Sequence, residues 1–176
     1  MANLIFEIVI MLLTIIAIIY SRLQNKNLLK RYFLVLIGVI IFDFATQIAW
    51  LTNNLHPFTF IGPNFNWLIS ITWTNLIFYI MYIVDKLSHS KEAKRFFIYL
   101  SSFAIGGILL EEILIRLSIR SYGPEVIDLL TGVHIPLLIS PIEVLYYIPV
   151  FMALILGFVR YFEIFQKTEL KKGNKK

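Results

Sequence analysis

The chain contains no cysteine and only three histidines. Disulfide bonds, thiol nucleophiles and cysteine-ligated metal sites are therefore excluded. The histidines are His56, His89 and His134, and none has the HxxH or HxxxH spacing of a metal-binding helix. We expect no metal and no other cofactor.

Polar residues are too few for a soluble domain. Hydrophobic residues make up 59% of the chain and the mean hydropathy is +0.78, which indicates an integral membrane protein. The sequence predicts an all-α fold, a single membrane domain over residues 1–176 with about five transmembrane helices, because each apolar run is close to the ~20 residues that cross a bilayer. The predicted spans are Leu4–Tyr20, Phe33–Leu51, Trp67–Val84, Phe96–Leu117 and Ile135–Phe162. The last span is longer than a bilayer requires, so we expect it to tilt, to kink at Pro141 or Pro149, or to extend beyond the lipid.

Positive charge is missing from the segment Thr52–Asn66, although the net charge is +5. Most lysines and arginines follow the first, third and fifth apolar runs, and only Arg116 and Arg120 lie near the outer end of the fourth. This asymmetry predicts a multi-pass protein of the cell membrane with its N-terminus outside and its C-terminus in the cytoplasm. Basic residues spread between apolar runs do not form a nucleic-acid-binding surface, and we expect no nucleic-acid partner.

Two segments, residues ~30–84 and ~94–162, share an ordered set of landmarks. Each begins with Lys-Arg followed by two aromatic residues, at Lys30–Phe33 and at Lys94–Phe97. Asp43 precedes Gly62 by 19 residues and Glu112 precedes Gly132 by 20, and each glycine is followed eight residues later by a serine. We predict one two-helix unit used twice. Because each unit has an even number of spans, the two would be related by an axis along the membrane normal.

Acidic residues inside the predicted spans are the main functional signal, because a charged group in hydrocarbon is costly. These residues are Glu7, Asp43, Glu111, Glu112 and Glu143. Helical spacing places Gln47 on the face of Asp43 and Arg116 on the face of Glu112, where an ion pair would form. Glu111 points about 100° away from Glu112, so the two have different surroundings. At ~1.5 Å per residue, Asp43, Glu112 and Glu143 lie at similar depths, which allows a carboxylate cluster in one layer.

Clustered carboxyl groups in a low-dielectric layer have raised and split pKa values, so one can stay protonated near neutral pH. Such an acid could protonate an alkene or a leaving group, relay protons in a carrier, or act as a hydrogen-bonding staple between helices. Trp73, Tyr146 and Tyr147 are typical of core or interface aromatics, and a cavity lined by them would suit a polyene or a carbocation. His134 is the histidine near the acid layer.

The run from Glu112 to Tyr161 resembles the membrane-embedded lycopene cyclases, a family of small carotenoid cyclases. The matching landmarks are the glycine of Thr131–Val133, then Ser140-Pro141-Ile142-Glu143, with Phe42-Asp43 and Glu111-Glu112 at the place of the family's Trp-Asp pair. Val144 replaces the second glutamate of the family's Pro-x-Glu-Glu motif, and the first unit has Ser70–Trp73 where that motif would stand. The resemblance implies an isomerase acting on an isoprenoid, or a related hydratase.

The resemblance also implies residue roles. Glu143 or Glu112 would donate the proton, Asp43 would set the local charge with Glu111 nearby, and Arg116 would hold Glu112 ionised. Substrate would be bound by Gln47, Arg116, His134, Trp73, Tyr146 and Tyr147. The expected partners are an apolar isoprenoid or lipid and the membrane lipids, with a homo- or hetero-oligomer left open.

Two other functions compete with the cyclase hypothesis. The chain could be a small carrier or assembly subunit, not an enzyme, whose acids serve proton coupling or helix packing. The stretch Glu111–Arg116 also reads EExxxR and resembles the first motif of the CAAX prenyl endopeptidases. That family needs histidine motifs on later spans, and only one predicted span follows here.

Overall fold

A computed structural model describes residues 2–62, 65–88, 92–136 and 138–173. Five long helices dominate, namely α1 (Ala2–Gln24), α2 (Lys26–Thr46), α3 (Trp67–Leu87), α4 (Glu92–Arg116) and α6 (Val144–Gly173). The short elements are the 3-10 turns η1 (Gln47–Ala49) and η2 (Pro57–Thr59), the strands β1 (Trp50–Thr52), β2 (Phe60–Ile61), β3 (Phe65–Asn66) and β4 (Arg120–Tyr122), and the one-turn helix α5 (Pro124–Ile127). Each long helix is apolar and long enough to cross a membrane, so the predicted all-α, five-span fold is confirmed.

The predicted start of the fifth span at Ile135 is wrong, since α6 begins at Val144. The residues before it form a small hairpin, in which the Ile135 amide donates to the Ser140 carbonyl and the Ile142 amide donates to the Val133 carbonyl. Pro141 belongs to this hairpin and lies outside the helix, so a helix kink there is also wrong. Pro149 lies inside α6, where it removes one backbone donor.

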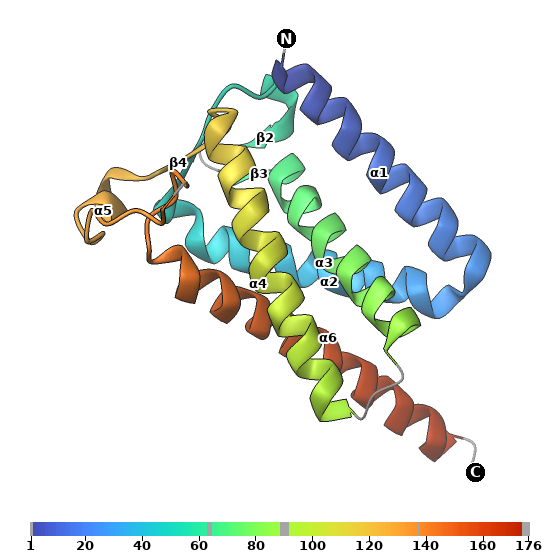
Figure 1. Cartoon of the computed structure of the whole chain (residues 1–176). Helices are drawn as coiled ribbons and strands as arrows, with labels where there is room; N and C mark the ends of the chain where they lie inside the picture. Colours follow the sequence, from blue (N-terminus) through green and yellow to red (C-terminus); the bar gives the residue numbers. More distant parts are fainter. Residues whose placement is uncertain (1, 63–64, 89–91, 137, 174–176) are drawn as a thin grey trace.

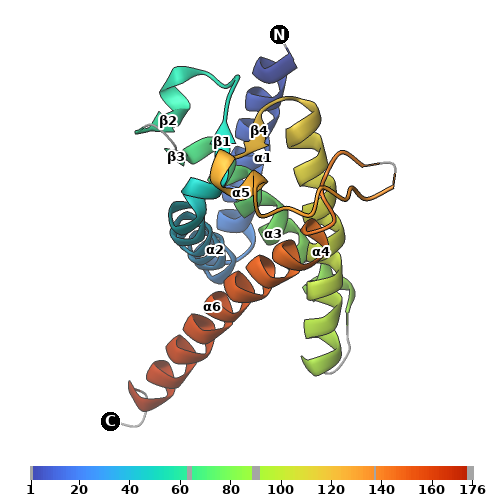
Figure 2. The ribbon, with the colours of Figure 1, turned by 90° about the vertical axis from the view of Figure 1, so that its left-hand side faces the viewer.

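Four of the helices form a ring. Helix α2 packs against α3 and α6, and α4 packs against the same two helices, while α1 lies outside the ring against α2 and α3. Helices α1, α3 and α6 run away from the end that carries the N-terminus and the strands, and α2 and α4 run back toward it (Figures 1 and 2). We call this end the loop end. The C-terminus lies at the opposite end.

The arrangement has the form of the predicted repeat, with α2 and α3 as one unit and α4 and α6 as the other. Strands β1 and β4, which follow α2 and α4, pair with each other in antiparallel register around Leu51 and Ser121. Gly62 and Gly132 both adopt a left-handed backbone, with φ of +79° and +75°. The two glycines are 70 positions apart, as are Leu51 and Ser121, so the same offset relates strands and turns.

Polar contacts close the ring at the end opposite the loops. Arg31 of α2 forms ion pairs of 2.5 Å with both Asp85 of α3 and Glu163 of α6. Tyr99 of α4 donates a hydrogen bond to Asp85, and Arg160 donates one to the Tyr99 hydroxyl at 2.9 Å. These contacts join α2 to α6 and α3 to α4, so both helices of each unit are held to the other unit at this end.

Close packing of α4 and α6 in the second unit depends on Gly107. A Cβ atom at this position would lie 2.6 Å from Cγ2 of Ile148, closer than real carbon contacts allow. The core beneath the loop end is continuous across the ring, and its fully buried members include Ile77, Phe103 and Met152. The helices that carry the acidic residues are therefore held in fixed positions.

Candidate functional site

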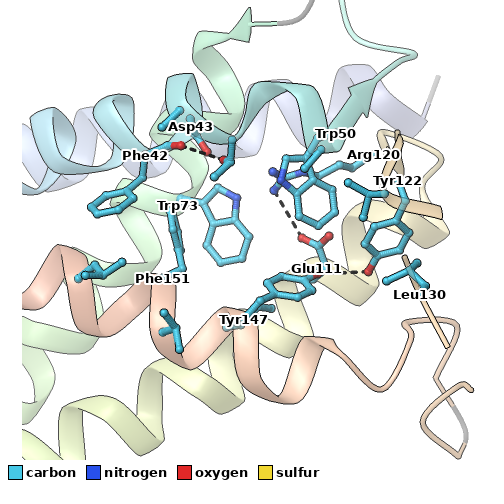
Figure 3. A pocket seen from close by; sticks show the side chains of 17 residues that line it. Phe42, Asp43, Trp50, Trp73, Glu111, Arg120, Tyr122, Leu130, Tyr147 and Phe151 are labelled. Atoms are coloured by element: carbon cyan, nitrogen blue, oxygen red, sulfur yellow. Dashed lines mark hydrogen bonds and ion pairs between the residues drawn. The ribbon is translucent and has the colours of Figure 1, made fainter. Parts of the chain in front are cut away.

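A cavity of about 490 Å³ lies within the ring at its loop end. This volume is within the usual range for small-molecule sites. Its walls come from both units: α2, η1, β1 and α3 on one side, and α4, β4, α5 and α6 on the other (Figure 3). The residues that carry the chemistry of this cavity are Phe42, Asp43, Trp50, Trp73, Glu111, Arg120, Tyr122, Tyr147 and Phe151.

A buried ion pair lies at one end of the cavity. Glu111 is fully buried and Arg120 is 6% exposed, and the Arg120 Nη1 atom lies 3.5 Å from Oε2 of Glu111. The Arg120 guanidinium also stacks on the Trp50 ring at 3.9 Å from its centroid. A buried charge needs such compensation, because each ion loses several kcal/mol of hydration on leaving water. The pair and its stack are visible at one side of Figure 3.

The end of α4 explains how Arg120 returns to the cavity. Ser118 adopts a left-handed backbone with φ of +53°, the Ser118 amide donates to the Ile115 carbonyl, and the Ile119 amide donates to the Leu114 carbonyl. These two bonds form a Schellman motif that ends the helix and reverses the chain. Pairing of β4 with β1 then fixes Arg120 opposite Thr52.

Four buried polar atoms around the cavity have no hydrogen-bond partner within the described part of the chain. They are Oδ2 of Asp43, Nε1 of Trp73, Oε1 of Glu111 and Nε of Arg120. Buried polar groups in native proteins are almost always hydrogen-bonded to protein or water, and exceptions call for an explanation. Their gathering around one cavity makes this cavity the candidate functional site.

Aromatic rings make up much of the remaining wall. Trp73 and Phe42 each contact Phe151 edge-on, with ring centroids 5.9 and 5.6 Å apart. The Tyr122 and Tyr147 hydroxyls are hydrogen-bonded to each other at 3.2 Å. Burial, and after it the charge of Glu111, raises the pKa of Tyr122, so this hydroxyl stays protonated at neutral pH.

The cavity reaches the surface between α2 and α6. Val150 and Leu154 line it and are 58% and 51% exposed, and Ala45 on α2 is exposed as well. In a bilayer this surface would face lipid, because both helices are membrane spans. An apolar molecule could therefore enter sideways from the lipid.

The structure divides the four acids predicted as site residues between two places. Asp43 and Glu111 line the cavity, together with the predicted aromatics Trp73 and Tyr147. Glu112 and Glu143 do not. The carboxylate cluster expected from the similar depths of Asp43, Glu112 and Glu143 is not formed, because the last two bind the loop before α6.

Glu112 holds that loop to α4. Its carboxylate accepts hydrogen bonds from the Ile139 amide at 3.0 Å, the Ser140 amide at 3.2 Å and the Ser140 hydroxyl at 2.9 Å. The predicted ion pair with Arg116 is present at 2.5 Å, but the Arg116 side chain is 54% exposed. Glu112 thus acts as the staple that was one of the alternatives for these acids.

Glu143 closes the same loop from the other side. Its Oε1 accepts a hydrogen bond from the Thr131 amide at 2.7 Å. This bond lowers the pKa of Glu143 below its ordinary value, because it favours the ionised form. A carboxyl group that is ionised near neutral pH is poorly suited to donate a proton there.

The remaining predicted site residues lie outside the main cavity. The His134 ring contacts the Ile139 carbonyl at 2.6 Å within the hairpin, and Tyr146 is 59% exposed on α6. Gln47 does lie beside Asp43, as its spacing predicts, and both line a second, smaller cavity. His89 falls outside the described residues.

Sequence reasoning missed Arg120 and its partner Trp50. A signal existed, since Arg120 lies on the side where the charge asymmetry leaves few basic residues. Its contact with Trp50 could not be foreseen, because strand pairing brings together segments 70 positions apart.

Within the described ranges, no group of three or more His, Asp or Glu side chains is placed to hold a metal ion. No protein-family model, curated protein or solved structure matches this chain.

Proposed function

We propose that the protein is an isoprenoid cyclase of the isomerase class, which protonates a carbon–carbon double bond of a long apolar substrate within the membrane. The observation that carries the proposal is the carboxyl group of Asp43, which lines an aromatic cavity that opens between α2 and α6. Its Oδ2 is buried and has no hydrogen-bond partner among the described residues. Acid catalysis needs a positioned carboxyl group and a site that excludes bulk water. The resemblance to lycopene cyclases supports the same chemistry.

In the proposed reaction, Asp43 is the acid in place of Glu143 or Glu112. Its O–H proton is transferred to one alkene carbon, whose π electrons form the new C–H bond and leave a positive charge on the neighbouring carbon. A second double bond of the same substrate then bonds to that carbon and closes a ring. Loss of a proton from an adjacent carbon restores a double bond, so no oxidant or reductant is needed.

The cavity walls suit the charge that develops in this reaction. The faces of Trp73 and Phe151 offer π electrons to a carbocation. Glu111, paired with Arg120, supplies a fixed negative charge in a buried place and is the proposed acceptor of the departing proton. The Tyr122 and Tyr147 hydroxyls, hydrogen-bonded to each other at 3.2 Å, complete the polar part of this wall.

The proposal is tested by pigment analysis in a host that accumulates lycopene. The unmodified protein should convert lycopene to a cyclised product. Asp43→Asn should abolish conversion at an unchanged protein level, since an amide is not a usable acid at neutral pH. Glu143→Gln is the matched control, because it changes another buried carboxyl group that lies outside the cavity, and it should retain conversion.

Two outcomes would contradict the proposal. If the unmodified protein leaves the pigment unchanged, lycopene is not its substrate. If Asp43→Asn retains conversion while Glu143→Gln loses it, the acid has been assigned to the wrong carboxyl group.

A further inference from the structure

A second cavity of about 20 Å³ lies on the loop side of the main one. The two share the residues Asp43, Trp50 and Arg120, which therefore form the wall between them. The rest of the small cavity is lined by Gln47, Thr52, Phe65, Asn66 and Ile69, from η1, β1, β3 and α3.

The size and lining of the small cavity fit one water molecule. A volume of about 20 Å³ is above the ~10–15 Å³ that a buried water needs, and far below what a substrate needs. A buried water also needs two to four polar partners. Two of its lining residues carry a buried polar atom with no hydrogen-bond partner among the described residues, Oδ2 of Asp43 and Nε of Arg120. Gln47 and Thr52, in the same lining, have an amide and a hydroxyl group.

The small cavity comes close to the surface at Gln47 and Thr52. Gln47 and Thr52 are each partly exposed, whereas Asp43 Oδ2 and Arg120 are buried. Asn66 is already engaged, because its side chain caps α3 and donates to the Thr59 hydroxyl at 2.8 Å. Gln47 and Thr52 are thus the polar residues of this lining that lie toward the loop-end surface, and Gln47 is the one that follows Asp43 by four positions.

We propose that this small cavity is a water site through which Asp43 takes up its proton from the loop-end surface, by way of Gln47. The inference rests on the proposed function, in which Asp43 gives a proton to the substrate and Glu111 accepts the departing one. Asp43 must then be reprotonated in each turnover. The main cavity opens between α2 and α6 and the small cavity lies on the loop side, so the substrate and the proton reach Asp43 from opposite sides.

The test measures hydrogen exchange at Asp43 and needs no substrate. In infrared spectra of the full chain in lipid, the C=O stretch of the protonated Asp43 carboxyl should be identified as the band that Asp43→Asn removes. After transfer to D₂O the band should shift rapidly in the unmodified protein. In Gln47→Leu the shift should be at least tenfold slower.

Leu154→Phe is the control, because it narrows the lipid-side opening and leaves the small cavity intact, and it should exchange as fast as the unmodified protein. Thr52→Val, a nearly isosteric change in the same lining, should slow exchange at least threefold. This variant replaces Gln47→Leu as the test if Gln47→Leu does not fold.

The proposal is overturned if Gln47→Leu and Thr52→Val both exchange at the original rate, if only Leu154→Phe slows exchange, or if no band depends on Asp43. These outcomes are separate from the pigment assay. Slowed exchange together with unchanged lycopene would support the water site and refute the cyclase function for that substrate. Cyclised lycopene together with unaltered exchange would support the cyclase function and refute the water site.

Discussion

Removal of the Arg120 guanidinium should destabilise the fold through the carboxylate that it leaves behind. In Arg120→Met the apolar stem is largely retained, but Glu111 stays buried without the cation that lies 3.5 Å from it. Breaking one side of a buried ion pair costs about 3–5 kcal/mol. Because the separation is long for an ion pair, we expect a loss of about 3 kcal/mol, or roughly a 100-fold change in the unfolding equilibrium.

A double-mutant cycle separates this effect from lost packing against Trp50. Glu111→Gln alone strands the opposite charge and should cost a similar amount. The double variant should be about 2 kcal/mol more stable than the sum of the two single losses predicts, because neither charge is then buried alone. The free energy of unfolding would be followed by tryptophan fluorescence during reversible unfolding in mixed detergent micelles.

Arg116→Met is the matched control, since it makes the same chemical change in an ion pair whose arginine is 54% exposed. It should cost less than about 1 kcal/mol. The reasoning fails if Arg120→Met costs no more than this control, or if the cycle is additive within about 0.5 kcal/mol.

Three further predictions concern the loops and the topology. The pKa of Glu143 is lowered in the fold, so its carboxylate stabilises the protein above the ordinary glutamate pKa of about 4.3. This stabilisation is lost as the pH falls through the lower pKa of the folded state. In melting curves, the difference in stability between the unmodified protein and Glu143→Gln should therefore vanish at acid pH. Gly62→Ala and Gly132→Ala should each lower the free energy of unfolding by about 1 kcal/mol, because both residues have a left-handed backbone and an added Cβ atom would meet no neighbour within 4 Å. Unequal losses would argue against equivalent turns. A reporter fused after Lys176 should be active only in the cytoplasm, and an external signal would reverse the orientation that the charges predict.

Apolar run lengths and helical spacing predicted the five long helices and one short-range ion pair. The five spans follow from apolar runs near the length of a bilayer, and the Glu112–Arg116 pair follows from i,i+4 spacing. The start of α6 was missed because the loop before it is as apolar as a span, and its backbone bonds form a hairpin in place of a helix. Hydropathy does not distinguish these two structures.

The candidate site was predicted only in part, because some of its contacts depend on tertiary packing. Asp43 and Glu111 could be named as buried acids, since each lies in a span. Which acid of the Glu111-Glu112 pair faces the cavity depends on the rotation of α4 against its neighbours, and this rotation is set by packing across the ring. Arg120 depends on the pairing of β1 with β4, which no local pattern contains.

The pairing of β1 with β4 has the geometry of a homodimer interface. With the units aligned at an offset of 70 positions, Trp50 corresponds to Arg120 and Thr52 to Tyr122. The register pairs Trp50 with the counterpart of Thr52, and Thr52 with the counterpart of Trp50, as an isologous contact does. Two identical halves would carry the same residue at corresponding positions such as 50 and 120. The Arg120 guanidinium on the Trp50 ring joins two such corresponding positions, and a cation stacked on an aromatic ring cannot be made by two copies of one residue. Covalent linkage of the halves is thus what allows the symmetric frame to hold an asymmetric site, with one buried arginine between two different acids.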